Sequence, residues 1–85
     1  MAQQYNNPNA QNIKKRYAVL VFIKGSTAPL VLYVKEPMAL YEDLVHKMHE
    51  PKPVYIEEET EGPIKRVCFI SNQISAVAIQ EEQYV

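Results

Sequence analysis

Three consecutive glutamates, Glu57, Glu58 and Glu59, are the densest group of reactive side chains in the 85-residue sequence. Neighbouring carboxylates perform acid–base chemistry when a cleft holds them in different environments. In an extended strand only Glu57 and Glu59 share a face, because successive side chains point to opposite sides. Lys65 and Arg66 follow shortly afterwards and carry the opposite charge. We therefore expect a charged β-hairpin here and no catalytic residues.

A turn at Glu61 and Gly62 closes this hairpin, since glycine readily adopts the positive φ that a two-residue turn needs. In that register Val54 faces Phe69, Tyr55 faces Cys68, Ile56 faces Val67, Glu57 faces Arg66 and Glu58 faces Lys65. The register separates apolar from charged side chains and predicts two ion pairs. Pro63 weakens the ladder close to the tip, so a longer loop stays open as an alternative.

Glu42, His46 and His49 occupy a narrow sector of a predicted helix and have the side-chain types of a divalent metal site. The sequence contains neither an HExxH motif nor an identifiable fourth ligand. A solvated polar helix face explains the same three residues. We therefore predict no metal and no other cofactor.

Cys68 is the only cysteine, so an internal disulfide and a cysteine-rich zinc site are both excluded. A nucleophilic cysteine needs a helix N-terminus or a neighbouring base, whereas Cys68 lies in a predicted strand. The short sequence GST at residues 25–27 fits a turn and lacks the rest of a phosphate-binding loop. We predict that the protein is not an enzyme and binds no small-molecule substrate.

Lys14, Lys15 and Arg16 form a basic cluster next to Tyr17, a combination that can contact phosphates and a stacked base. The formal net charge of −1 gives no overall attraction to nucleic acid. Charges beside a very apolar strand also protect it from aggregation, and we favour that role. Nucleic-acid binding through these three residues is kept as the alternative function.

Residues 1–12 are rich in Asn and Gln and have little to bury, which predicts a disordered tail before one small domain over residues 13–85. The N-terminus does not resemble a secretory signal. The longest apolar runs, residues 18–23 and 30–34, are too short for a membrane-spanning helix. We expect a cytoplasmic protein without a membrane segment.

Strands are expected over residues 16–25, 30–35, 54–60, 63–71 and 74–82, and a helix between Pro37 and Pro51. The helix has one apolar arc, made of Met38, Leu40, Tyr41, Leu44, Val45 and Met48. The predicted fold class is α+β, a single domain of order β-β-α-β-β-β. In it, one helix packs on a mostly antiparallel five-stranded sheet.

The last two predicted strands are expected to form a second hairpin. A three-residue loop over residues 71–73 is favoured over a two-residue turn at Asn72 and Gln73, because it places Val67 opposite Val77. The favoured register puts four apolar side chains on the core side, namely Val67, Phe69, Val77 and Ile79. Ala76 and Ala78 then face the other way, beside Cys68.

A single helix covers only one face of such a sheet, so the second face is free to bind. The residues predicted on this face are Tyr17, Tyr55, Cys68, Ala76 and Ala78. We predict a non-catalytic protein-interaction module that binds a protein partner or itself, for example as a homodimer. Contact is expected through the second sheet face or through a strand edge.

Overall fold

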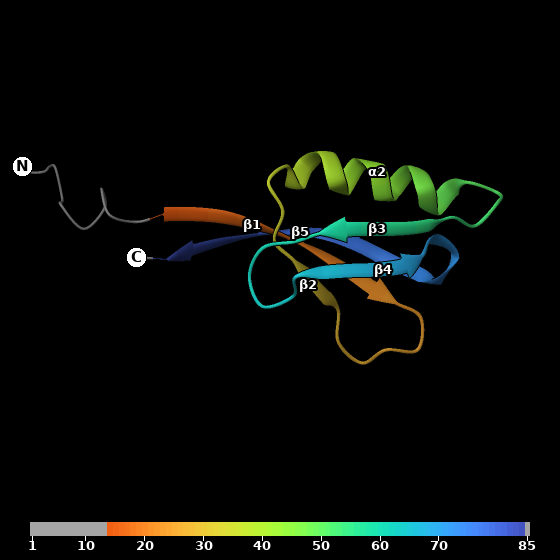
Figure 1. Ribbon diagram of the computed structural model, residues 1–85, viewed down its shortest axis with the longest axis horizontal. Coiled ribbons are helices and arrows are strands. Elements are labelled where there is room, and N and C mark those ends of the chain that lie inside the picture. The colour runs from red at the N-terminus through yellow and green to blue at the C-terminus, as the bar shows by residue number, and fades with distance from the viewer. Residues whose placement is uncertain (1–13, 85) are drawn as a thin grey trace, which may run out of the picture.

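The computed structural model describes residues 14–84 and has the predicted α+β architecture and element order (Figure 1). The elements are β1 (Lys14–Ile23), β2 (Leu30–Leu32), α2 (Pro37–His49), β3 (Tyr55–Glu59), β4 (Arg66–Ile70), the 3-10 helix η1 (Ser71–Gln73) and β5 (Ile74–Tyr84). Strand β2 is shorter than expected. The tail predicted over residues 1–12 lies outside the described residues.

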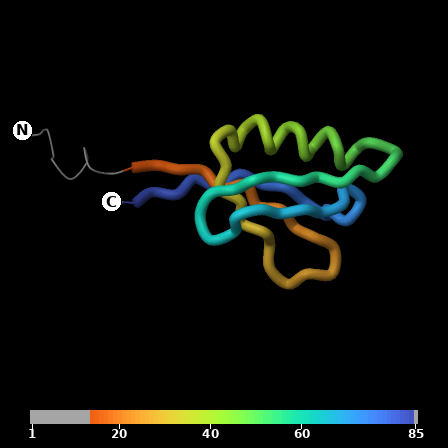
Figure 2. The backbone as a smooth tube through the Cα atoms, in the orientation of Figure 1, coloured from red at the N-terminus to blue at the C-terminus, as the bar shows by residue number. Residues whose placement is uncertain are grey.

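The five strands form two antiparallel sheets, and the predicted single sheet is therefore divided. One sheet has the order β2-β1-β5 and the other pairs β3 with β4. Strand β5 pairs with β1 from Lys14↔Tyr84 to Ile23↔Ile74. The two ends of the described chain consequently run side by side (Figure 2). Two sheets form in place of one because β5 pairs with β1 and not with its sequence neighbour β4.

The β3–β4 hairpin forms, but its register differs by two residues from the prediction. Ile56 faces Phe69, and Glu59 faces Arg66. The chain turns through a longer loop, in which the Thr60 N–H donates to the Lys65 carbonyl oxygen over 3.0 Å. The longer-loop alternative is thus the right one. Because the shift is even, the buried face of each strand is unchanged.

The predicted pairing of β4 with β5 is wrong, although residues 71–73 do form the connection. They make η1, after which β5 joins β1. Ser71 is buried and fixes this corner to the start of β3. Its Oγ accepts a hydrogen bond from the Val54 N–H, and its own N–H donates to the Val54 carbonyl, both over 2.9 Å. Ser71 thus continues the β3–β4 contact at the point where β5 turns away.

Helix α2 begins with Pro37 at its first turn, as predicted, and packs on β5 and β1. It lies with β3 and β4 on one face of the β2-β1-β5 sheet (Figure 1). The core between these layers consists of Val19, Val21, Leu32, Leu40, Leu44, Ile56, Phe69 and Ile74. Beyond α2, the outer ends of β1 and β5 continue as a two-stranded arm (Figure 1). None of the helices within residues 14–84 has the length and apolar character needed to cross a membrane.

Candidate functional site

The sheet β2-β1-β5 presents an apolar face on the side away from the core. Side chains alternate along β1, so Leu20 and Phe22 point away from the buried Val19 and Val21. On the neighbouring strand β5, Ala78 lies opposite Leu20 and Ala76 lies opposite Phe22. On the other neighbouring strand, β2, Val31 lies opposite Leu20. We call these five residues, Leu20, Phe22, Val31, Ala76 and Ala78, the open face. The α2 helix and the β3–β4 pair both lie on the other side of the sheet (Figure 1).

The five residues predicted to bind a partner lie on three different surfaces. Ala76 and Ala78 belong to the open face. Tyr17 lies on the opposite face of the arm, where its hydroxyl donates to Glu81 over 3.3 Å. Tyr55 and Cys68 are exposed on the outer face of the β3–β4 pair. The predicted common surface is therefore wrong, because β5 pairs with β1 and carries the alanines away from Cys68.

Strand β5 also has a free edge. It is the last strand in the order β2-β1-β5, and β1 is its only strand partner within residues 14–84. An edge strand exposes a row of backbone N–H and C=O groups that a further strand can pair with. The strand is eleven residues long. It therefore offers a long backbone surface for strand addition.

One flank of α2 carries apolar side chains that the core does not bury. Leu40 and Leu44 are buried, whereas Tyr41 and Val45 are half-buried and Met38 is 52% exposed. We call Met38, Tyr41 and Val45 the outer flank of α2. The predicted apolar arc contained all of these residues. The width of this arc indicated that the sheet would not cover all of its residues.

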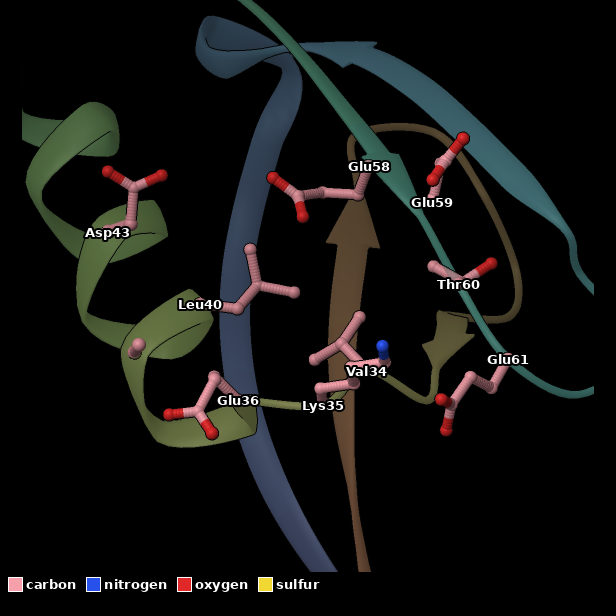
Figure 3. Close-up of a pocket in the computed structure, with 10 residues that line it drawn as sticks. Val34, Lys35, Glu36, Leu40, Asp43, Glu58, Glu59, Thr60 and Glu61 are labelled. Atoms are coloured by element: carbon pink, nitrogen blue, oxygen red, sulfur yellow. The ribbon is translucent and has the colours of Figure 1, made fainter.

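A groove with many carboxylates separates α2 from β3 (Figure 3). Its volume is about 580 Å³, and its acidic lining consists of Glu36, Asp43, Glu58, Glu59 and Glu61. Leu40 points into it from α2, and Glu58 points from β3 toward α2 (Figure 3). Two of the carboxylates form ion pairs, Asp43 with Lys47 and Glu59 with Arg66, each at 2.7 Å. Sequence reasoning missed this groove because its sides are far apart in the chain.

The groups considered for catalysis or metal binding stay separate. Glu59 pairs with Arg66, and Glu57 lies opposite Cys68. The Nδ1 atom of His49 lies 2.7 Å from the Val45 carbonyl oxygen. That nitrogen must donate a proton to the carbonyl, so it has no lone pair for a metal. Within residues 14–84 no three His, Cys, Asp or Glu side chains gather closely enough to hold a metal ion.

Arg16, from the basic cluster, contacts residues of the arm and Tyr33, which follows β2. Its Nε donates to Glu82 Oε1 over 3.0 Å, and its Nη2 donates to the Tyr33 hydroxyl over 3.4 Å. Its guanidinium lies 4.1 Å from the centre of the Tyr33 ring and 5.3 Å from that of Tyr84. The hydrogen bond between Arg16 and Glu82 is the main cause that lowers the pKa of Glu82 and raises that of Arg16. Of the basic cluster, only Lys14 and Lys15 lie outside this network.

These surfaces differ in whether their side chains and backbone groups already have partners among the described residues. Arg16, Asp43 and Glu59 have partners of opposite charge. The open face and the edge of β5 have no counterpart among the described elements. In comparisons with known proteins, the chain matches no family model, no curated protein and no solved structure.

Proposed function

We propose that the protein is a non-catalytic interaction module that associates with further copies of itself. The observation that carries this proposal is that the β2-β1-β5 sheet ends in an eleven-residue strand with a free edge. The same sheet carries the apolar open face. An unpaired edge and an uncovered apolar face are the two features of a sheet that favour association.

The non-catalytic character is supported by the placement of the reactive side chains. The three consecutive glutamates lie in a hairpin strand and are divided between its faces. Their nearest cation, Arg66, is used in an exposed ion pair. A cytoplasmic location is part of the proposal, and the exposed free thiol of Cys68 is compatible with a reducing compartment.

Nucleic-acid binding through Lys14, Lys15 and Arg16 has less support. Arg16 already donates to Glu82 and stacks on Tyr33. A phosphate would have to compete with the Glu82 carboxylate for the same guanidinium. Two lysines supply little of the clustered positive charge that nucleic acid rewards.

The test immobilises the tagged chain and passes over it either the untagged chain or a mixed-sequence single-stranded DNA. We expect the untagged chain to be retained at both low and high salt, because apolar and backbone contacts are little screened. We expect the DNA to pass through. Retention of DNA that disappears at high salt, without retention of the chain, would contradict the proposal and favour the alternative.

A further inference from the structure

The groove between α2 and β3 runs along an unpaired edge of β3. Strand β3 lies between α2 and β4 (Figure 1). The groove lining includes residues 58–61 and, from α2, Ala39, Leu40 and Asp43, but no residue of β4. Within residues 14–84, β4 is the only strand that pairs with β3. The groove is therefore bounded by a strand edge on one side and by a helix on the other.

The direction of the backbone groups on this edge follows from the hydrogen bonds of the hairpin. The Thr60 N–H donates across the hairpin over 3.0 Å, toward the side of β4. Because this direction alternates along an antiparallel strand, Glu57 and Glu59 present their N–H and C=O groups on the opposite edge. The Glu61 N–H marks that edge, since it donates to the Tyr33 carbonyl oxygen over 2.6 Å. Two residues of β3 thus offer unpaired backbone donors and acceptors beside the groove.

The charges around this edge are mainly negative. The lining of the groove contains five carboxylates and one basic side chain, that of Lys35. Asp43 and Glu59 form ion pairs on their outer sides, with residues that do not line the groove. The other carboxylates of the lining form no ion pair within residues 14–84, and they are those of Glu36, Glu58 and Glu61.

We propose that the groove binds an extended basic peptide of another protein, which adds to β3 as a further antiparallel strand. The inference goes beyond the proposed self-association and does not depend on it. The carboxylates alone would attract any cation, whereas the unpaired edge selects an extended chain, whose backbone can pair with it. The antiparallel direction continues the bridge between Tyr33 and Glu61 on the same edge. The groove volume of about 580 Å³ is within the range of about 300–1,000 Å³ that is usual for ligand clefts.

The added strand meets a carboxylate at each of three successive positions. Opposite Glu57 and Glu59 its side chains face outward, as those of the two glutamates do. Opposite Glu58 its side chain faces inward, because Glu58 shares a face of β3 with the buried Ile56. An inward lysine or arginine lays its methylene groups on Leu40 and reaches Glu58 with its charged end (Figure 3). The run of three glutamates thus recognises a run of three basic residues.

The first test uses a capped fluorescent peptide with three consecutive lysines between threonines, titrated with the full-length chain and followed by fluorescence anisotropy. A peptide with three glutamates in place of the lysines is the control. We expect the lysine peptide to bind, with an affinity that falls as the salt concentration rises, and the glutamate peptide not to bind. A wild-type chain that does not bind the lysine peptide overturns the proposal.

Two N-methylated forms of the lysine peptide test the addition of a strand. In the proposed register the first and third lysines donate their backbone N–H groups to β3, and the middle lysine directs its own away. Methylation of the two outer backbone nitrogens is expected to raise the dissociation constant by about fivefold or more, since two hydrogen bonds are lost. Methylation of the middle nitrogen should leave the affinity nearly unchanged. Equal effects would show attraction between charges without strand pairing and would overturn the proposal.

Variants of the chain test the position of the peptide. Glu58→Lys reverses the charge at the centre of the contact, and Glu42→Lys makes the same change at an exposed position of α2 outside the groove lining. We expect Glu58→Lys to raise the dissociation constant by about tenfold or more, because like charges then meet, and Glu42→Lys to change it little. Circular dichroism checks both folds, and Glu58→Gln, which keeps the side-chain shape, should weaken binding in the same direction. Binding that neither Glu58 variant weakens overturns the site.

Size-exclusion chromatography of the same variants distinguishes this site from self-association. We expect Glu58→Lys to associate like the wild type, because Glu58 belongs neither to the open face nor to β5. If Glu58→Lys abolishes self-association and the wild type does not bind the lysine peptide, the groove holds a second copy and the proposed occupant is wrong. A wild-type chain that binds the peptide as a single chain of 9.8 kDa supports the groove and contradicts the proposed function alone.

Discussion

Gly62 connects the β3–β4 loop to Tyr33, and its backbone and surroundings both require glycine. Its φ is +88°, and a Cβ atom there would lie 3.0 Å from Cδ2 of Tyr33. Gly25 has a similar φ of +83° but has nothing within 4 Å of the same position. Comparing substitutions at Gly62 and Gly25 therefore separates the energetic cost of the unfavourable φ from that of the contact with Tyr33.

Replacing Gly62 by alanine is expected to destabilise the fold by about 1–3 kcal/mol through the unfavourable φ, with an added loss from the Tyr33 contact. Gly25→Ala is the matched control and should lose only the first contribution. Urea unfolding followed by circular dichroism measures both free energies. Equal losses would show that the Tyr33 contact carries no energy.

Glu82 gives the arm a pH dependence. Its pKa is lowered in the folded state from an ordinary value of 4.5, chiefly by the hydrogen bond from Arg16. A carboxylate with a lowered folded pKa stabilises the fold above its unfolded pKa, and this contribution disappears as the pH falls through the folded pKa. The ion pair thus stabilises the arm at neutral pH and is lost in acid.

We expect Glu82→Gln to be less stable than the wild type at neutral pH. The difference in unfolding free energy should shrink as the pH drops below 4.5. Urea unfolding at several pH values measures it, with Glu81→Gln as the control for loss of one carboxylate from β5. A difference that stays constant into acid would contradict the role of the Arg16–Glu82 pair.

Among the elements, α2 is attached to the sheet mainly by its buried side. Leu44 is fully buried and Met38 is half exposed. Leu44→Ala is expected to lower the unfolding free energy by about 2–5 kcal/mol, as for other buried leucines, and Met38→Ala by much less. Denaturant unfolding compares the two variants. Similar losses would mean that the outer flank of α2 is already packed within the monomer.

Elements whose signals are local could be predicted from the sequence. Pro37 and the apolar arc specify α2, and the alternation around Ile56 and Phe69 specifies the faces of the β3–β4 hairpin. The partner of β5 could not be predicted, because β5 is apolar enough to pair with either β4 or β1. Pairing with the distant β1 closes a long stretch of chain, and no local pattern records that choice.

For the candidate site too, local features could be predicted from the sequence, whereas features that depend on long-range strand pairing could not. Ala76 and Ala78 were correctly expected to face away from the core, since alternation along one strand is local. Their grouping with Tyr55 and Cys68 depended on strand order and is wrong. The Arg16–Glu82–Tyr33 network was missed for the same reason, because it joins β1, β5 and the segment after β2.

In the whole molecule, the two faces of the β2-β1-β5 sheet are covered to different extents. One side of the β2-β1-β5 sheet is covered by α2 and the β3–β4 pair, while the open face and the edge of β5 have no described counterpart. The proposed self-association would cover surface that one copy leaves exposed, at the open face or at the edge of β5.

Sedimentation equilibrium of the wild-type chain over a wide concentration range tests this account most directly. We predict that the average mass rises above 9.8 kDa as the concentration increases, because the open face and the edge of β5 can each contact a further copy of the chain. A mass that remains at 9.8 kDa at the highest concentration would contradict it.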